Sequence, residues 1–231
     1  MKKYELTAEF IEKWGKKLFR IKALIGFGSV EAGELGGYVE KEDNLAQNGN
    51  AWVFDDAEVY GNAKVYGNAW VYGNAEVYGN ARVYDDAWVY GDARVYGNAE
   101  VYGDARVYGN ARVCDDAWVY GNAWVCGNAR VCDDAWVYGN AWVCGNADYL
   151  LIGRIGSRFS FTTFFKNKDK GITVSCGCFL GTIAEFRAKV TDTHGNNKHA
   201  KMYNLAADMA ELQILGEEHF DKLNTNKSEP F

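Results

Sequence analysis

Residues 57–80 read AEVYGN AKVYGN AWVYGN AEVYGN, four copies of one six-residue unit with no insertion between them. The unit continues in both directions, so residues 51–146 divide into sixteen consecutive hexads. Every hexad has Ala first and Val third, a variable second residue, an aromatic residue or Cys fourth, and Gly or Asp followed by Asn or Asp at the end. A repeat this short and regular predicts a solenoid, in which each unit packs against the next.

Charge decides which face of the repeat is inside. Successive side chains of an extended segment point to opposite faces, so Ala and Val share one face while the variable and aromatic residues share the other. Nine of the sixteen variable residues are Glu, Lys or Arg, and unpaired charges are costly in a narrow apolar interior. We therefore expect Ala and Val inside. The last two residues of each hexad tolerate the dihedral angles of a tight corner.

The unit Val-Tyr-Gly-Asn-Ala-x resembles the hexapeptide repeat of left-handed β-helix proteins, among them bacterial transferases. The resemblance implies a mainly β fold, a left-handed β-helix with three hexads, or 18 residues, per coil. With that period one outer column is aromatic apart from Arg106, and its members are Trp52, Trp70, Trp88, Trp124 and Trp142. This aromatic ladder has three interpretations: it covers itself by stacking, it forms an oligomer or protein interface, or it holds a sugar or a base.

The segments outside the repeat predict three further parts. Residues 1–50 are expected to form an N-terminal β cap, because an open solenoid end exposes unpaired backbone. Residues 147–216 are expected to form a small α+β module, and residues 217–231 a flexible tail. Within the module we expect strands at 149–155, 159–165 and 171–179, then helices at 182–193 and 197–215.

Short motifs in the flanking segments carry a second resemblance. The entry segment LFRIKAL at 18–24 precedes GGYV at 36–39, and the module contains CGCF at 176–179 and THG at 193–195. This arrangement is similar to hexapeptide-repeat proteins encoded by phages and prophages. The resemblance implies a structural or binding protein of phage or prophage type.

Histidine placement argues against the enzymes known on this solenoid. Acyltransferases and γ-class carbonic anhydrases resemble this repeat, and both depend on histidines in or beside the coils. All three histidines of this chain, His194, His199 and His219, lie beyond residue 146. We therefore predict no catalytic residue, no metal and no cofactor. A hexapeptide-fold acyltransferase with a site formed between subunits remains an alternative.

Polar residues of the C-terminal module form the one candidate ligand site. Arginine and hydroxyl donors suit phosphate and other anions, which makes this group a candidate site for a small nucleotide-like anion. The alternative interpretation is that they are ordinary turn and strand residues. The group comprises Ser157, Arg158, Thr162, Thr163 and His194.

Cysteine spacing follows the coil period. Cys114 and Cys132, like Cys126 and Cys144, are one 18-residue coil apart, which places each pair near disulfide distance. The N-terminus has no signal-peptide pattern, so we expect reduced thiols and a cytoplasmic protein of a bacterial host cell. Cys176 and Cys178 are interpreted as small core residues.

Charge and hydropathy limit the partners. The net charge is −6, and residues 51–146 hold 13 acidic and 6 basic residues, which argues against nucleic acid on the solenoid. No apolar run is long enough to cross a membrane. The remaining expectations are a homo-oligomer, with a protein or a small anion bound at the C-terminal module.

Overall fold

The computed structural model describes residues 1–217 in two compact units, residues 1–140 and the residues from Ala141 onward. The predicted flexible tail, residues 217–231, lies outside the described residues except for Glu217. No helix within residues 1–217 is both long and apolar enough to cross a bilayer.

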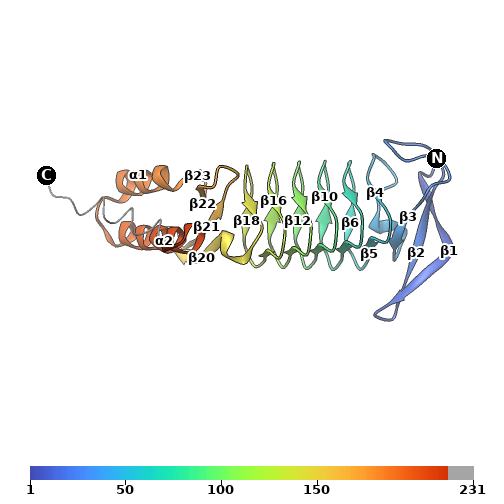
Figure 1. The fold of residues 1–231 in the computed structure, drawn as a ribbon, viewed down its shortest axis with the longest axis horizontal. Coiled ribbons are helices and arrows are strands. Elements are labelled where there is room, and N and C mark those ends of the chain that lie inside the picture. Colours follow the sequence, from blue (N-terminus) through green and yellow to red (C-terminus); the bar gives the residue numbers. More distant parts are fainter. Residues whose placement is uncertain (218–231) are drawn as a thin grey trace. The chain divides into compact units, whose positions relative to one another are not determined.

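Fifteen hexads of the first unit each form a two-residue strand, made by the variable residue and the Val. Figure 1 shows the resulting coils as parallel rungs. The strands are β4 (Trp52–Val53), β5 (Glu58–Val59), β6 (Lys64–Val65), β7 (Trp70–Val71), β8 (Glu76–Val77), β9 (Arg82–Val83), β10 (Trp88–Val89), β11 (Arg94–Val95), β12 (Glu100–Val101), β13 (Arg106–Val107), β14 (Arg112–Val113), β15 (Trp118–Val119), β16 (Trp124–Val125), β17 (Arg130–Val131) and β18 (Trp136–Val137).

Each strand pairs in parallel with the strand 18 residues away, as Val89 does with Val71 and Val107. Three sheets result, with orders β5-β8-β11-β14-β17, β4-β7-β10-β13-β16 and β6-β9-β12-β15-β18. The Ala and Val residues of the hexads are fully buried. The predicted β-solenoid, with three hexads per coil and an Ala-Val interior, is confirmed.

Residues with positive φ angles form the corners between the strands of each coil. Gly67 has φ +71°, and a Cβ there would lie 2.8 Å from the backbone nitrogen of Asp85 in the next coil. Asp55, Asp85, Asp115 and Asp133 replace glycine at four corners with φ between 52° and 60°, a region that aspartate tolerates better than most residues. The corner is therefore set by both the dihedral angle and the close approach of the next coil.

The N-terminal cap consists of three strands and a short 3₁₀ helix. Strands β1 (Tyr4–Lys13) and β2 (Lys16–Ala23) form an antiparallel hairpin, and β3 (Leu35–Val39) follows and pairs in parallel with β5. A short 3₁₀ helix, η1 (Glu42–Asn44), comes next. Half of the β1 side chains are exposed, and they lie on both faces of the strand, so its sequence lacks the alternation that marks a half-buried strand.

The second unit begins with the last hexad strand, β19 (Trp142–Val143), and the 3₁₀ helix η2 (Asn146–Asp148). An antiparallel sheet follows, β20 (Tyr149–Ile155), β21 (Ser160–Lys166), β22 (Ile172–Cys176) and β23 (Phe179–Thr182), then helices α1 (Ile183–His194) and α2 (Lys198–Leu215). A shared apolar core includes Phe164 and Val174 of the sheet with Phe186 and Tyr203 of the helices. The predicted strand at 171–179 is divided by a turn at Gly177, whose φ is +59°.

Candidate functional site

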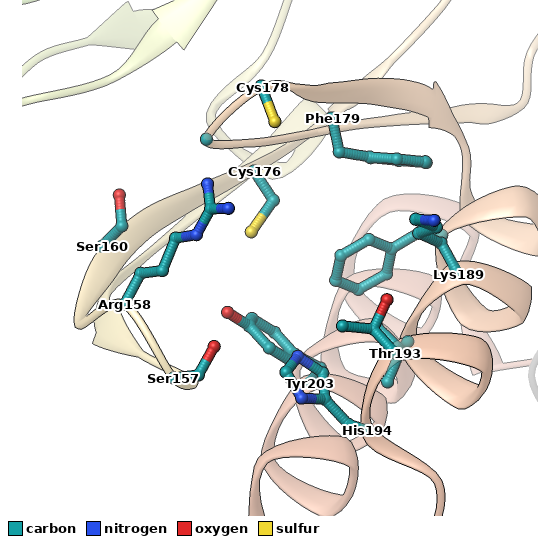
Figure 2. Close-up of a pocket in the computed structure, with 13 residues that line it drawn as sticks. Ser157, Arg158, Ser160, Cys176, Cys178, Phe179, Lys189, Thr193, His194 and Tyr203 are labelled. Atoms are coloured by element: carbon teal, nitrogen blue, oxygen red, sulfur yellow. The ribbon is translucent and has the colours of Figure 1, made fainter.

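A cavity of about 220 Å³ lies in the C-terminal module between two strand turns and the two helices. Figure 2 shows polar side chains from all four segments converging on it. The β20–β21 turn contributes Ser157 and Arg158, and the β22–β23 turn contributes Cys176 and Cys178. Binding sites of drug-sized molecules usually span roughly 300–1,000 Å³, so this cavity suits a small ligand or the charged end of a larger one.

The β20–β21 turn is shaped to receive a side chain from α2. Gly156 has φ +74°, and a Cβ at this position would lie 1.9 Å from the Tyr203 hydroxyl oxygen. Only glycine leaves room for that oxygen. The close approach fixes the Tyr203 hydroxyl beside Ser157 and Arg158, as Figure 2 shows.

Helix α1 supplies the opposite wall of the cavity. Thr182 caps its first turn, because the Thr182 hydroxyl accepts from the Glu185 backbone N–H at 3.2 Å while the Glu185 carboxylate accepts from the Thr182 N–H at 2.8 Å. From this start, Lys189 and Thr193 fall one turn apart on the side that faces the cavity. The His194 ring stacks on Tyr203 at 5.7 Å between centroids.

The charges around the cavity have one sign. Arg158 and Lys189 line it together with the imidazole of His194, and among residues 1–217 no Asp or Glu does. Within residues 1–217 Arg158 takes part in no salt bridge, and Lys189 has one exposed contact of 3.3 Å with Asp192, a type of pair worth little in water. The arrangement therefore favours an anion, with charge-assisted hydrogen bonds available from Arg158 and Lys189.

A thiol lies in the wall of the same cavity. The Thr162 hydroxyl and the Cys176 sulfur form a hydrogen bond of 3.2 Å. Burial is the main cause that raises the pKa of Tyr203, and the charge and hydrogen bonding of Cys176 raise it further. A hydrogen bond with the Ser157 backbone and the charge of Arg158 lower this pKa by less. The Tyr203 hydroxyl therefore keeps its proton across the physiological range and remains a donor.

Three of the five predicted site residues line the cavity and two do not. Ser157, Arg158 and His194 are brought together. Thr162 is fully buried and reaches the site only through Cys176, and Thr163 is buried at 3% exposure. Neighbouring residues of a strand point to opposite faces, so Thr163 lies on the face of β21 opposite to Thr162.

Sequence reasoning missed Lys189, Tyr203 and the role of Cys176 in the wall. An aromatic residue at helical spacing is usually a core residue, and Tyr203 does pack in the core with its ring. Its hydroxyl points into the site. The glycine at 156, just before Ser157, was the one local signal that something approaches this turn closely.

The aromatic ladder of the solenoid differs at its first member. Trp52 is fully buried, with Tyr4 at 6.0 Å and Phe27 at 5.3 Å between ring centroids. The expectation that all five tryptophans face water or a partner is therefore wrong for Trp52, because the N-terminal cap covers it. Trp142, at the other end of the predicted ladder, is 38% exposed.

Further along the column the side chains cover one another. Trp70 and Trp88 stack at 5.4 Å, and the Arg106 guanidinium lies 4.7 Å from the Trp88 ring and 5.4 Å from the Trp124 ring. The tyrosines of the fourth hexad position stack in the same way, for example Tyr72 on Tyr90 at 4.7 Å. This geometry is what the self-stacking interpretation requires.

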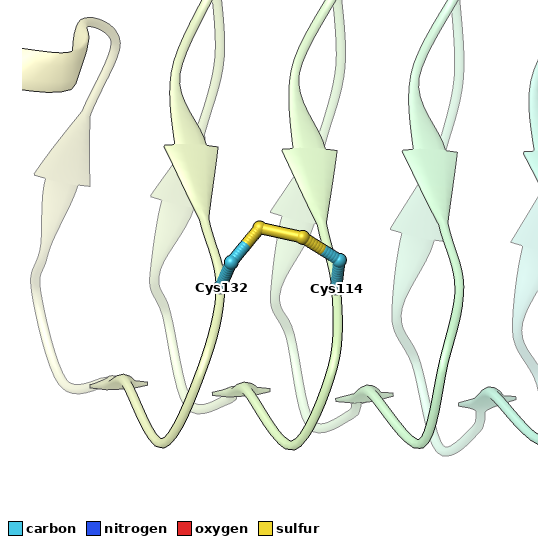
Figure 3. The surroundings of a disulfide bond; sticks show 2 residues. All are labelled: Cys114 and Cys132. Carbon is cyan, nitrogen blue, oxygen red and sulfur yellow. A yellow bond between two sulfur atoms is a disulfide. The ribbon is translucent and has the colours of Figure 1, made fainter.

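A disulfide bond joins Cys114 to Cys132 on adjacent coils, with a Cα–Cα distance of 4.6 Å (Figure 3). The expectation of reduced thiols is wrong for this pair. Because β14 and β17 pair in parallel and in register, Cys114 and Cys132 occupy equivalent positions on adjacent coils. Cys176 and Cys178 are free thiols.

Comparison with known proteins supports the fold. The family model described as the YdcK β-solenoid repeat matches eight segments of the chain, residues 57–73, 75–91, 87–103, 93–109, 99–115, 105–121, 111–127 and 129–145. Each match is one residue short of an 18-residue coil. The repeat region is a β-solenoid. These matches all lie within the hexads.

One curated relative is similar over part of its length. The "Uncharacterized acetyltransferase YdcK" of Escherichia coli (strain K12) is 38% identical over 74 residues, which cover 28% of this chain and 23% of that protein. The chain therefore matches less than a quarter of the relative's length.

Proposed function

We propose that this protein is a non-catalytic β-solenoid scaffold whose C-terminal module binds a small anionic ligand. The observation that supports the proposal is the cavity lined by Arg158, Lys189 and His194, to which the described part of the chain adds no carboxylate. The hydroxyls of Ser157 and Tyr203 add neutral donors to the same wall. Phosphate and carboxylate groups take such donor sets.

The size of the cavity narrows the ligand class. A volume of about 220 Å³ holds a phosphate or carboxylate group together with a few further atoms, while the rest of a nucleotide-like molecule would extend through the open side. Sequestration of such a molecule is a role compatible with the phage-type resemblance of the flanking motifs.

Calorimetric titration with inorganic phosphate and with mononucleotides tests this function. Loss of one charge-assisted hydrogen bond removes roughly 1.5–3 kcal/mol, so Arg158→Gln and Lys189→Gln should each weaken binding by about tenfold or more. Lys201→Gln, on the exposed side of α2 and outside the cavity, is the matched control and should bind as the unaltered chain does. Equal affinity of all four proteins would contradict the proposal.

Self-association through the solenoid is a second candidate function. Trp118 and Trp136 stack at 5.1 Å, and Trp136 is still 41% exposed. Exposed large aromatics are enriched at protein interfaces. Light scattering should then report an oligomer that Trp136→Ser shifts toward the monomer, and a monomeric unaltered chain would exclude this function.

Acyl transfer is a third candidate, favoured only by the name of the Escherichia coli relative. The absence of His from residues 51–146 removes the base that the hexapeptide-fold enzymes depend on. Acetyl-CoA should therefore give no heat of binding and no transfer. A clear acetyl-CoA titration would replace the non-catalytic proposal.

A further inference from the structure

The cavity holds two free thiols besides its cations. Cys176 ends β22 and Cys178 follows in the turn, and both line the cavity. The turn has two central residues, since Cys176 pairs with Phe179. Gly177 takes the first of them with φ +59°, the position that a type II′ turn reserves for glycine. The two thiols are therefore held on one tight turn at the edge of an anion site.

Hydrogen-bond donors and a cation surround the Cys176 sulfur. The Thr162 hydroxyl oxygen lies 3.2 Å from this sulfur. The Tyr203 hydroxyl points toward the sulfur from α2, as Figure 2 shows. The Arg158 Nη1 atom is 3.6 Å from the position that a Cβ on Gly177 would occupy. The reactive form of a cysteine is the thiolate, and this is the set of groups that solvates a thiolate outside water.

We propose that Cys176 and Cys178 are a reactive dithiol that reduces one equivalent of a small anionic disulfide held in this cavity by Arg158 and Lys189. The inference rests on the anion site proposed above and names its ligand class as a low-molecular-weight disulfide carrying carboxylates. Neither thiol is needed for the apolar core, whose cluster of buried residues packs without Cys178 and has Cys176 only at its margin.

The two steps balance as thiol–disulfide exchange. The Cys176 thiolate attacks one sulfur of the ligand, a bond forms between the Cys176 sulfur and that half, and the other half leaves as a thiolate. Cys178 then loses its proton to solvent and attacks the Cys176 sulfur, which forms the Cys176–Cys178 disulfide and releases the second half as a thiolate. Two electrons pass from the protein dithiol to the ligand disulfide.

The test uses the full chain and two disulfide reagents, the dianionic dithiobis(nitrobenzoate) and the neutral dithiodipyridine. A cationic cleft raises the encounter rate with an anion by about tenfold or more. The ratio of the two second-order rate constants should therefore fall about tenfold in Arg158→Gln, whereas Arg154→Gln, exposed and outside the cavity, should keep the ratio of the unaltered chain. Taking ratios cancels the intrinsic reactivity of each reagent.

Cysteine variants locate the reaction. Cys176→Ser should abolish the fast phase of the reaction with dithiobis(nitrobenzoate). In Cys178→Ser the reaction should stop at a mixed disulfide on Cys176, which peptide mass spectrometry identifies. The unaltered chain should instead release two thionitrobenzoate molecules per dithiol and carry no adduct. A fast phase that survives Cys176→Ser, or a ratio unchanged by Arg158→Gln, would overturn the proposal.

Failure of the dithiol and failure of the anion site are distinguishable. Phosphate titration of the Cys176→Ser chain reports the anion site without the thiol. Phosphate binding without a fast reaction of the thiols overturns only the redox step. If the unaltered chain binds no phosphate, the proposed function is overturned as well.

Discussion

In the solenoid an outward polar side chain meets a partner one coil away, whereas in the C-terminal module several polar side chains meet at a cavity. The Asn62 amide donates to Asn80 at 3.2 Å, and Arg82 pairs with Glu100 at 3.3 Å, each across 18 residues. Arg158, by contrast, has no salt bridge within the described residues. A repeat supplies partners for its own surface, while a segment that occurs once can leave donors available to a ligand.

The largest expected effect tests the solenoid half of this comparison. Val95→Asp would bury an unpaired carboxylate in the fully buried Val column, and such substitutions destabilise by about 4 kcal/mol or more. Arg94→Asp changes the neighbouring outward residue of the same strand and should lower stability by less than about 1 kcal/mol. Urea denaturation measures both, and equal losses would contradict the assignment of faces.

The disulfide gives the next largest effect. Cys114→Ser opens a loop with a sequence separation of 18, and the chain-entropy relation assigns a loop of this length about 3 kcal/mol. The measurement is the urea midpoint without reductant, with Cys178→Ser as the control from the other region. An unchanged midpoint in Cys114→Ser would show that the bridge does not form.

A smaller effect comes from the stacked tyrosines. Burial, then the neighbours Tyr138 and Tyr102, raises the pKa of Tyr120 to about 12 from 10.0. In the unfolded chain the Tyr120 hydroxyl therefore ionises at a lower pH than in the folded chain. The stability that this ring contributes is complete below pH 10 and is lost as the pH rises toward 12. Tyrosinate absorbance of the folded chain should appear late, and ionisation of all tyrosines near pH 10 while the coils remain folded would contradict the stacking.

The smallest effect on stability belongs to the cavity. Arg158→Gln removes an exposed side chain that forms no salt bridge in the described part of the chain, so its urea midpoint should shift by less than about 0.5 kcal/mol. Ligand affinity should fall at the same time. A large loss of stability would instead show that Arg158 is a structural residue and would weaken the contrast between the two regions.

The repeat could be predicted almost completely from its residues, and the site only in part. Ala and Val at fixed positions determine the interior, and the charges at the second position exclude the opposite choice of faces. Ser157, Arg158 and His194 were found from their donor chemistry. Tyr203 and Lys189 were not, since their place in the site depends on how α1 and α2 pack on the sheet.

The missed features share one physical origin. Whether Trp52 is exposed depends on Tyr4 and Phe27, which are distant in sequence, and no local pattern predicts their contact. The pairing of Cys114 with Cys132 was visible in the spacing, but the oxidation state was inferred from the expected compartment and not from the geometry.

The most direct measurement for the central claim is an anomalous difference map from crystals soaked in selenate, an anion with the shape of sulfate. The account predicts a peak in the module cavity, within hydrogen-bond distance of Arg158 and Lys189. No peak in the cavity, with selenate bound instead at solenoid arginines such as Arg112, would contradict it.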